Sequence, residues 1–169
     1  MAKVEVSIEE EGWNSLSFIK IIERACSVTL EQLEIDSRFQ ISVLGCSDGR
    51  IATLNSKFRN KEEVTNVLSW PAEERSARKP GILPPKPKFL EKHENELGDL
   101  AFAYNFCVEE AKLIGRMPAD HLTHLAVHGT MHLLGFDHIL EKDAVLMEDI
   151  EIRILKKPVS YTHLTLPTN

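Results

Sequence analysis

Apolar and polar residues alternate, or β-branched and apolar residues cluster, in four short segments of the chain. Alternation with a period of two is typical of strands that bury one face. One of these segments ends at Pro71, a residue that is poorly tolerated inside a sheet. The pattern therefore predicts strands over residues 4–8, 38–44, 65–70 and 98–103.

Other apolar residues recur at intervals of three and four, the spacing of one helix face. Ser47-Asp48-Gly49 predicts a turn before one such segment. Pro118 stands where a helix tolerates proline, and Gly135 is a typical stop signal. We expect helices over 16–33, 51–59, 104–115, 118–134 and 141–155. The last of these offers a packing face made of Ala144, Val145, Met147, Ile150 and Ile154.

These elements mix without strict alternation of strand and helix, which indicates an α+β fold. We expect a single domain over residues 1–157, with a small mixed four-stranded sheet and about five helices. Residues 158–169 depart abruptly from this pattern and are interpreted as a non-native tail derived from a translated sequencing adapter. His163, which lies in that tail, is left out of the functional interpretation.

Residues 71–96 form a long loop with five prolines and many charges. It is either a mobile insertion, the favoured interpretation, or a flap over a cleft. Its cations are interpreted as solvated surface, with RNA contact as the alternative: Arg75, Arg78, Lys79, Lys86 and Lys88. His93 in the same loop is expected to be solvated.

Composition narrows the class of protein. The formal net charge of −6 argues against a diffuse nucleic-acid-binding surface, although it leaves room for a local basic cleft. Three cysteines without a paired spacing indicate reduced thiols in the cytoplasm. We expect no membrane span, because no apolar run is long enough.

The most informative motif for function is a run with three histidines, His128-Gly-Thr-Met-His132-Leu-Leu-Gly135-Phe-Asp-His138. In a helix, His128 and His132 lie about 40° apart on one face, one turn above the other. Gly135 ends the helix, so the chain can turn back and deliver His138. Three imidazoles with a vacant fourth position are typical of catalytic zinc. We therefore predict a metal site at the end of a buried helix.

The same spacing occurs in metzincin proteases, but those enzymes carry a glutamate base directly after the first histidine. This chain has Gly129 there, which argues against peptide cleavage. His121 and His124 lie on the same helix face. His124 is either an outer-shell or catalytic group or a simple hydrogen-bonded residue, and the simple interpretation is favoured for His121. Asp137 either orients a ligand imidazole or caps the following helix.

The histidine run closely resembles the signature of the YbeY family of bacterial zinc-dependent endoribonucleases and rRNA maturation factors. Two further blocks are similar to that family in the same order, and the likeness covers roughly residues 3 to 156: Leu54-Asn55-Ser56-Lys57-Phe58-Arg59 with Thr65-Asn66-Val67-Leu68-Ser69-Trp70-Pro71, and Leu97-Gly98-Asp99-Leu100. The resemblance implies that His128, His132 and His138 bind one Zn²⁺ and that Arg59 is the key basic residue of the cleft. Lys57 and Lys61 are further candidates for substrate binding.

By the same resemblance, the expected function is single-strand-specific endoribonuclease activity in 16S rRNA 3′-end maturation and ribosome quality control. The implied partners are precursor RNA and ribosomal subunits, with ribosomal proteins and an exoribonuclease as further partners. Zinc would supply electrophilic assistance while Arg59 binds the phosphate. The general base is left open among a metal-bound hydroxide, an imidazole such as His124, and the RNA 2′-hydroxyl pathway.

The chain departs from the usual family pattern at Asn66, where aspartate is usual, and at Trp70, where phenylalanine is usual. Asparagine keeps the shape and a carbonyl acceptor but carries no charge. The 71–96 loop is also longer than usual. Two other function classes remain open: a metal-dependent hydrolase of peptides or small phosphoesters, and a non-catalytic ribosome-assembly adaptor with structural zinc.

Overall fold

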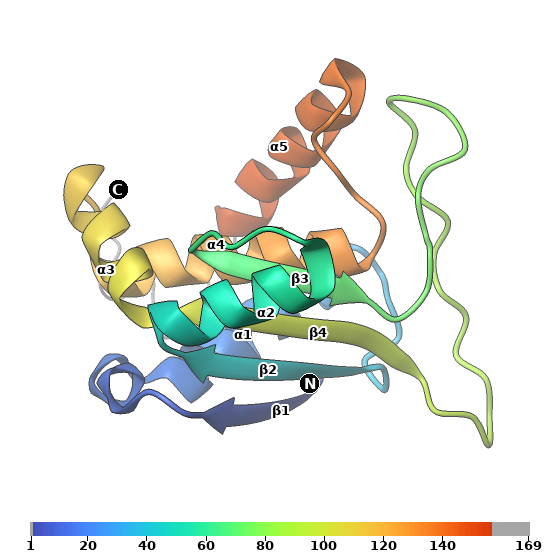
Figure 1. Ribbon diagram of the computed structural model, residues 1–169. Coiled ribbons are helices and arrows are strands. Elements are labelled where there is room, and N and C mark those ends of the chain that lie inside the picture. Colours follow the sequence, from blue (N-terminus) through green and yellow to red (C-terminus); the bar gives the residue numbers. More distant parts are fainter. Residues whose placement is uncertain (1, 157–169) are drawn as a thin grey trace.

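Four strands form one mixed sheet in the spatial order β1-β2-β4-β3, in a computed structural model that describes residues 2–156. Strands β1, β2 and β4 are parallel, whereas β3 pairs with β4 antiparallel and forms one edge. Figure 1 shows the sheet with α2 in front of it. The strand bounds are β1 (Lys3–Ile8), β2 (Gln40–Cys46), β3 (Val67–Pro71) and β4 (Glu96–Ala103).

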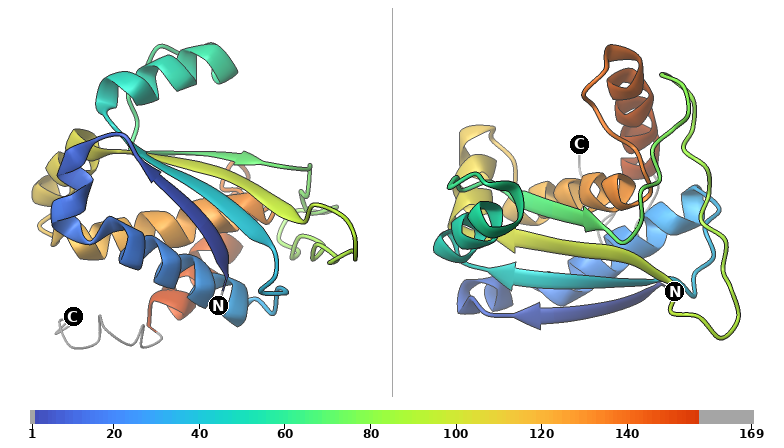
Figure 2. Two further views of the ribbon diagram at one scale, coloured as in Figure 1. Left: turned by 90° about the horizontal axis from the view of Figure 1, so that it is seen from below. Right: turned by 45° about the vertical axis from the view of Figure 1, so that its right-hand side comes forward.

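The helices lie on both faces of the sheet. Helices α1 and α4 cover one face, and α2 lies on the opposite face (Figure 2). The expected α+β class and four-stranded mixed sheet are confirmed. The described residues contain five α-helices and one 3-10 helix: η1 (Glu11–Leu16), α1 (Phe18–Gln32), α2 (Asp48–Arg59), α3 (Tyr104–Leu113), α4 (Pro118–Leu133) and α5 (Glu141–Leu155).

The prediction of a turn at residues 47–49 is wrong. Ser47 caps α2, because its Oγ accepts a hydrogen bond from the Arg50 backbone N–H at 3.1 Å. Asp48 and Gly49 are therefore the first residues of the helix, and the Asp48 carboxylate suits the positive end of its dipole. Residues that often form turns served here as a helix start.

One expected helix boundary and one expected packing residue also differ. The expected helix over 16–33 is interrupted at Ser17, whose φ of +56° separates η1 from α1. Val145 is exposed rather than packed, whereas Met147, Ile150 and Ile154 are buried as expected. On α5 the buried stripe includes one charged residue, Glu151.

The main core lies between the sheet and the helices α1, α4 and α5. Helix α4 is buried on nearly every face, in agreement with its apolar sequence. A smaller cluster under α2 contains Cys46, Ile51, Leu68, Ala101 and Ala103. Burial raises the pKa of the Cys26 thiol to about 11, consistent with an unreactive structural cysteine.

The segment between β3 and β4 has no helix or strand, but it contacts the rest of the protein at several points. Arg75 is 8% exposed, so the expectation that it is a solvated surface cation is wrong. Its guanidinium donates to the backbone carbonyls of Leu97 and Leu133 at 3.1 and 3.0 Å. Further along, Phe89 packs edge-on against Phe39. The other four cations named in the sequence analysis are exposed, as is His93.

Within residues 2–156, every helix is too short or too polar to cross a membrane. The proposed adapter-derived tail, residues 158–169 with His163, lies outside the described part of the chain.

Candidate functional site

A cavity of about 1080 Å³ opens between α4, the edge strand β3 and the first residues of the 72–95 segment. It brings together residues that are far apart in the sequence. Five histidines from α4 and the residues that follow it line the cavity, together with a carboxylate from α5 and the guanidinium at the end of α2: His121, His124, His128, His132, His138, Glu151 and Arg59.

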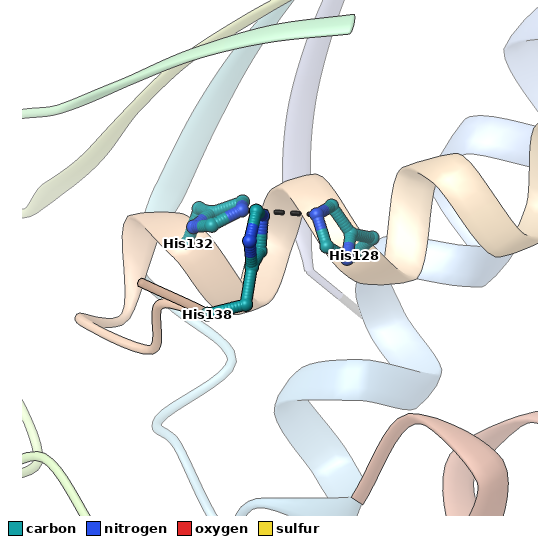
Figure 3. Close-up of side chains that lie close together, drawn as sticks. All are labelled: His128, His132 and His138. Atoms are coloured by element: carbon teal, nitrogen blue, oxygen red, sulfur yellow. Dashed lines mark hydrogen bonds between the residues drawn. The ribbon is translucent and has the colours of Figure 1, made fainter. Parts of the chain in front are cut away.

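Three imidazoles converge at one wall of this cavity. His128 and His132 lie one turn apart on α4, and His138 reaches them from the segment after the helix (Figure 3). One nitrogen from each ring lies within 4.8 Å of the others, so the three residues could hold a metal ion. The ring centroids are 4.5 to 5.3 Å apart. The spacing predicted from the sequence thus brings these side chains together.

The turn that delivers His138 depends on Gly135. Its φ of +102° lies in the left-handed region, which L side chains rarely adopt. A Cβ at this position would lie 2.1 Å from the backbone oxygen of Arg75. The end of α4 and the start of the long segment are therefore packed backbone against backbone beside the histidines.

Hydrogen bonds fix the orientation of the two helical imidazoles. His132 Nδ1 lies 2.9 Å from the Phe136 carbonyl, which can only accept, so Nδ1 carries the proton. His128 Nδ1 contacts the Glu151 carboxylate in the same way. Both Nε2 atoms then present lone pairs, and they face each other at 2.9 Å. Two facing lone pairs repel each other, and a cation bound between them would relieve that repulsion.

His132 is also held in its neutral form. Burial and, after it, the neighbouring His128 lower the pKa of His132 to about 4. A neutral imidazole is the form that binds a metal ion. The environment of this residue therefore suits a ligand rather than a proton donor.

Glu151 on α5 is the functional residue that sequence reasoning missed. Its side chain is 6% exposed and bridges two histidines, with Oε1 at 3.1 Å from His124 Nε2 and Oε2 against His128 Nδ1. Burial raises its pKa, but hydrogen bonds from His124 and His128 outweigh that effect and bring the pKa down to about 2. A lone carboxylate on the apolar stripe of α5 was the available signal.

His124 occupies both of its ring nitrogens in this arrangement. Nδ1 lies 3.0 Å from Arg116 Nη1, and a guanidinium can only donate. Nδ1 is therefore the acceptor, and Nε2 carries the proton toward Glu151. These contacts support a role for His124 in orienting Glu151, whereas the role of His124 as a general base stays a prediction.

His121 lies deeper and belongs to a separate network. Its Nε2 is 2.6 Å from Glu110 Oε1, and Asn66 Nδ2 donates to the same oxygen at 2.8 Å. The amide of Asn66 thus supplies a donor, whereas a carboxylate at this position would face the carboxylate of Glu110. The departure at residue 66 is consistent with its neighbours. His121 fits the simple hydrogen-bonded interpretation.

Arg59, the last residue of α2, lies at the cavity, where its Nη2 donates to the Ser69 carbonyl in β3. Lys57 and Lys61 are exposed near it, but they are not among the residues that line this cavity. Asp137 accepts a hydrogen bond from the Ile139 backbone N–H at 3.3 Å in a local turn. The interpretation that it caps the following helix is wrong, because the N-cap of α5 is Leu140, without a side-chain cap.

Gly129, the residue that replaces a protease base, points away from the cavity. A Cβ there would lie 3.0 Å from Leu100 Cδ2 and 3.6 Å from Val67 Cγ2, on the side facing the sheet. Any side chain at this position would enter the core. The geometry therefore provides no base at residue 129 for peptide cleavage.

Comparisons with known proteins agree with the histidine motif. A family model described as "Endoribonuclease YbeY" matches residues 3–158. Curated proteins named Endoribonuclease YbeY include those of Dinoroseobacter shibae, 47% identical over 92% of this chain and 86% of the relative, and Bartonella quintana, 35% identical over 93% of each.

A solved structure is also similar. The solution structure of TM1509 from Thermotoga maritima superposes with a TM-score of 0.61 and covers 96% of this chain and 91% of that protein. Its sequence identity is 17%, so this likeness supports the fold alone. The family match and the curated relatives confirm the resemblance found in the sequence, and the chain belongs to the YbeY endoribonuclease family.

Proposed function

We propose that this protein is a zinc-dependent endoribonuclease that cleaves single-stranded RNA. The observation that carries the proposal is the meeting of three imidazoles and Arg59 at one cavity. Family membership supports RNA as the substrate and 16S rRNA 3′-end maturation and ribosome quality control as the cytoplasmic process. Ribosomal proteins and an exoribonuclease are proposed as partners on the family resemblance alone.

The donor set supports zinc as the metal. Three neutral imidazole nitrogens with room for a further ligand are typical of catalytic zinc. The facing Nε2 lone pairs of His128 and His132 fit a cation, since no proton is available to join them in the neutral form. When bound, zinc supplies Lewis-acid stabilisation of negative charge on the phosphate.

Residues of the protein bind the phosphate and orient the metal-binding histidines. Arg59 exchanges its contact with the Ser69 carbonyl for the phosphate and stabilises the charge that develops during cleavage. Glu151 holds His128 in the tautomer that presents Nε2 to the cavity. His124, held by Arg116, fixes the other oxygen of Glu151.

The direct test combines metal analysis with cleavage assays. Purified protein is expected to contain about one zinc per chain and to cut an unstructured RNA, whereas a perfectly paired duplex of the same sequence stays intact. A chelator is expected to stop cleavage, and added zinc to restore it. Cleavage that continues after complete removal of metal contradicts the proposal.

Arg59→Ala is expected to lower RNA cleavage by about 10²- to 10³-fold, the cost of losing one preorganised donor to developing charge. Bound zinc should remain unchanged, because Arg59 contacts none of the three imidazoles in the structure. Single-turnover cleavage rates and metal content measure the two effects.

Arg50→Ala is the matched control for this experiment. Arg50 lies near the start of the same helix and pairs with Glu9 at 3.2 Å, far from the cavity lining. If both arginine variants lose the same activity, the loss reflects damage to α2, and the phosphate role of Arg59 is wrong.

Glu151→Gln is expected to weaken zinc affinity by about 10- to 100-fold, the usual cost of losing the partner of a ligand imidazole. Glutamine keeps the shape, but its amide offers one oxygen where the carboxylate served two histidines. Competition with a fluorescent zinc chelator measures the affinity without reference to activity.

Glu148→Gln on the exposed face of α5 makes the same chemical change outside the cavity and should leave zinc affinity as in wild type. Equal affinity of the Glu151 and Glu148 variants would rule out the proposed orienting contact.

A further inference from the structure

Helix α2 lies on its own face of the sheet, opposite α1 and α4 (Figure 2). A second cavity of about 560 Å³ lies on this face, lined by residues of α2 and of all four strands. We call it the α2 groove. Its apolar lining includes Leu54, Phe58 and Trp70, and two carboxylates also line it: Glu5 on β1, and Asp99, which pairs with Trp70 across β3 and β4. None of these residues has a role in the proposed metal site.

Phe58 is the unusual residue of this groove. Phe58 is 59% exposed, on a helix whose other exposed side chains are polar. It packs against Trp70 in an edge-type contact, with centroids 5.9 Å apart and planes at 68°. Trp70 Nε1 is buried without a hydrogen-bond partner among the described residues. The wall is therefore aromatic, accessible and supported from behind.

Charges around the groove are arranged asymmetrically. Lys57, Arg59 and Lys61 are exposed around the end of α2, in a chain with a formal net charge of −6. Lys57 Nζ lies 5.6 Å from the centroid of the Phe58 ring. Cations beside an exposed ring suit a phosphate followed by a base, and the two carboxylates that line the groove suit the amino groups of a base. This complementarity favours nucleic acid over an apolar peptide.

The groove adjoins the metal cavity through two pairs of consecutive residues. Arg59 and Ser69 line the metal cavity, whereas Phe58 and Trp70 line the α2 groove. Neighbouring Cα atoms are about 3.8 Å apart, so the two sites meet at the β3 edge. A strand whose phosphate contacts Arg59 can place its next base beside Phe58.

We propose that the α2 groove binds an unpaired nucleobase of the RNA strand, stacked on Phe58 and Trp70 next to the phosphate held by Arg59. The inference rests on the proposed function for its ligand, and it adds a base-binding subsite outside the metal cavity. A paired base cannot enter the groove, because stacking on Phe58 requires a free face of the base. The subsite therefore contributes to selection of single strands.

The test uses full-length protein in chelator, so that RNA is bound and not cut. The chain has two tryptophans, and Trp13 is fully buried with its Nε1 donating to the Cys46 carbonyl at 3.2 Å. Trp70 is therefore the fluorescent reporter. Unstructured RNA of about ten nucleotides should quench wild-type emission, as expected for base stacking. Trp70→Phe should abolish the quenching.

Phe58→Ala is expected to weaken RNA affinity by about 5- to 150-fold, the usual range for loss of one base-stacking contact. Phe58→Leu, which keeps apolar area but lacks an aromatic face, should lose nearly as much, and Phe58→Tyr should retain wild-type affinity. Leu113→Ala is the control, since Leu113 is 86% exposed at the end of α3 and lines neither cavity.

Several outcomes would overturn the subsite. They are wild-type affinity in Phe58→Ala, full affinity in Phe58→Leu, equal quenching by duplex or abasic RNA, and concentration-dependent dimerisation that Phe58→Ala abolishes. Failure of the proposed function gives a different result. If wild-type protein binds RNA with quenching of its emission but does not cleave RNA in the presence of zinc, the subsite stands and the nuclease proposal is wrong.

Discussion

His128→Ala is expected to abolish stoichiometric zinc binding and to lower RNA cleavage by about 10³-fold or more. The variant loses one of three donors, which costs more than the 10- to 100-fold typical of outer-shell partners. Without bound metal the Lewis-acid contribution, worth several kcal/mol of transition-state stabilisation, is also lost. Metal analysis by mass spectrometry and single-turnover cleavage measure the two losses on the same preparation.

A second variant, His138→Ala, separates catalysis from a structural role for the metal better than His128→Ala does. His128 also donates to the buried Glu151, so its loss costs about 1–3 kcal/mol of folding free energy. His138→Ala avoids this complication, because His138 is exposed and belongs to the segment after α4. It should lose zinc and cleavage while keeping a melting temperature close to that of the metal-free wild type.

His93→Ala serves as the histidine control, since His93 is exposed in the long segment away from the cavity lining. A structural zinc would give a different pattern, in which His138→Ala unfolds the protein. Full cleavage by folded His138→Ala lacking metal would contradict the catalytic role of the site.

Gly135→Ala is expected to be the most destabilising single substitution considered, at about 3–5 kcal/mol. The new Cβ would lie 2.1 Å from the Arg75 backbone oxygen, and the backbone φ of +102° is unfavourable for alanine. Relief requires the Arg75 segment to move, although its guanidinium is anchored to carbonyls at Leu97 and Leu133. Melting followed by circular dichroism should show a fall of about 10 °C or more.

Gly49→Ala provides the matched control. Gly49 lies in the first turn of α2, and the nearest atom to a new Cβ is Ser47 Oγ at 4.0 Å. Alanine should be neutral or stabilise by up to about 1 kcal/mol there, because it is the better helix former. If Gly135→Ala melts like Gly49→Ala, the close packing of α4 against Arg75 is wrong.

Helix α4 explains why part of the site was predictable from sequence. The distance between His128 and His132 depends on helical geometry, which apolar spacing and Pro118 indicate locally. The reversal at Gly135 is also local, since few other residues adopt its backbone conformation. Convergence of His138 with the pair follows from these two features.

Other parts of the site depend on which elements pack together. Glu151 meets His128 because α5 packs on α4, and no local pattern in α5 specifies that partner. Arg75 looked like one more loop cation, but its burial depends on carbonyls supplied by two distant elements. The start of α2 at residues 47–49 was mistaken for a turn, because Ser, Asp and Gly favour both turns and helix starts.

By itself, the sequence determined the α+β class, the family and the three imidazoles, because helix periodicity and the glycine stop act over a few residues. The tertiary structure alone decided that Glu151 orients His128, that Arg59 lies at the metal cavity and that Phe58 faces a separate groove. These contacts join residues distant in the chain, and packing of the core between sheet and helices sets their distances.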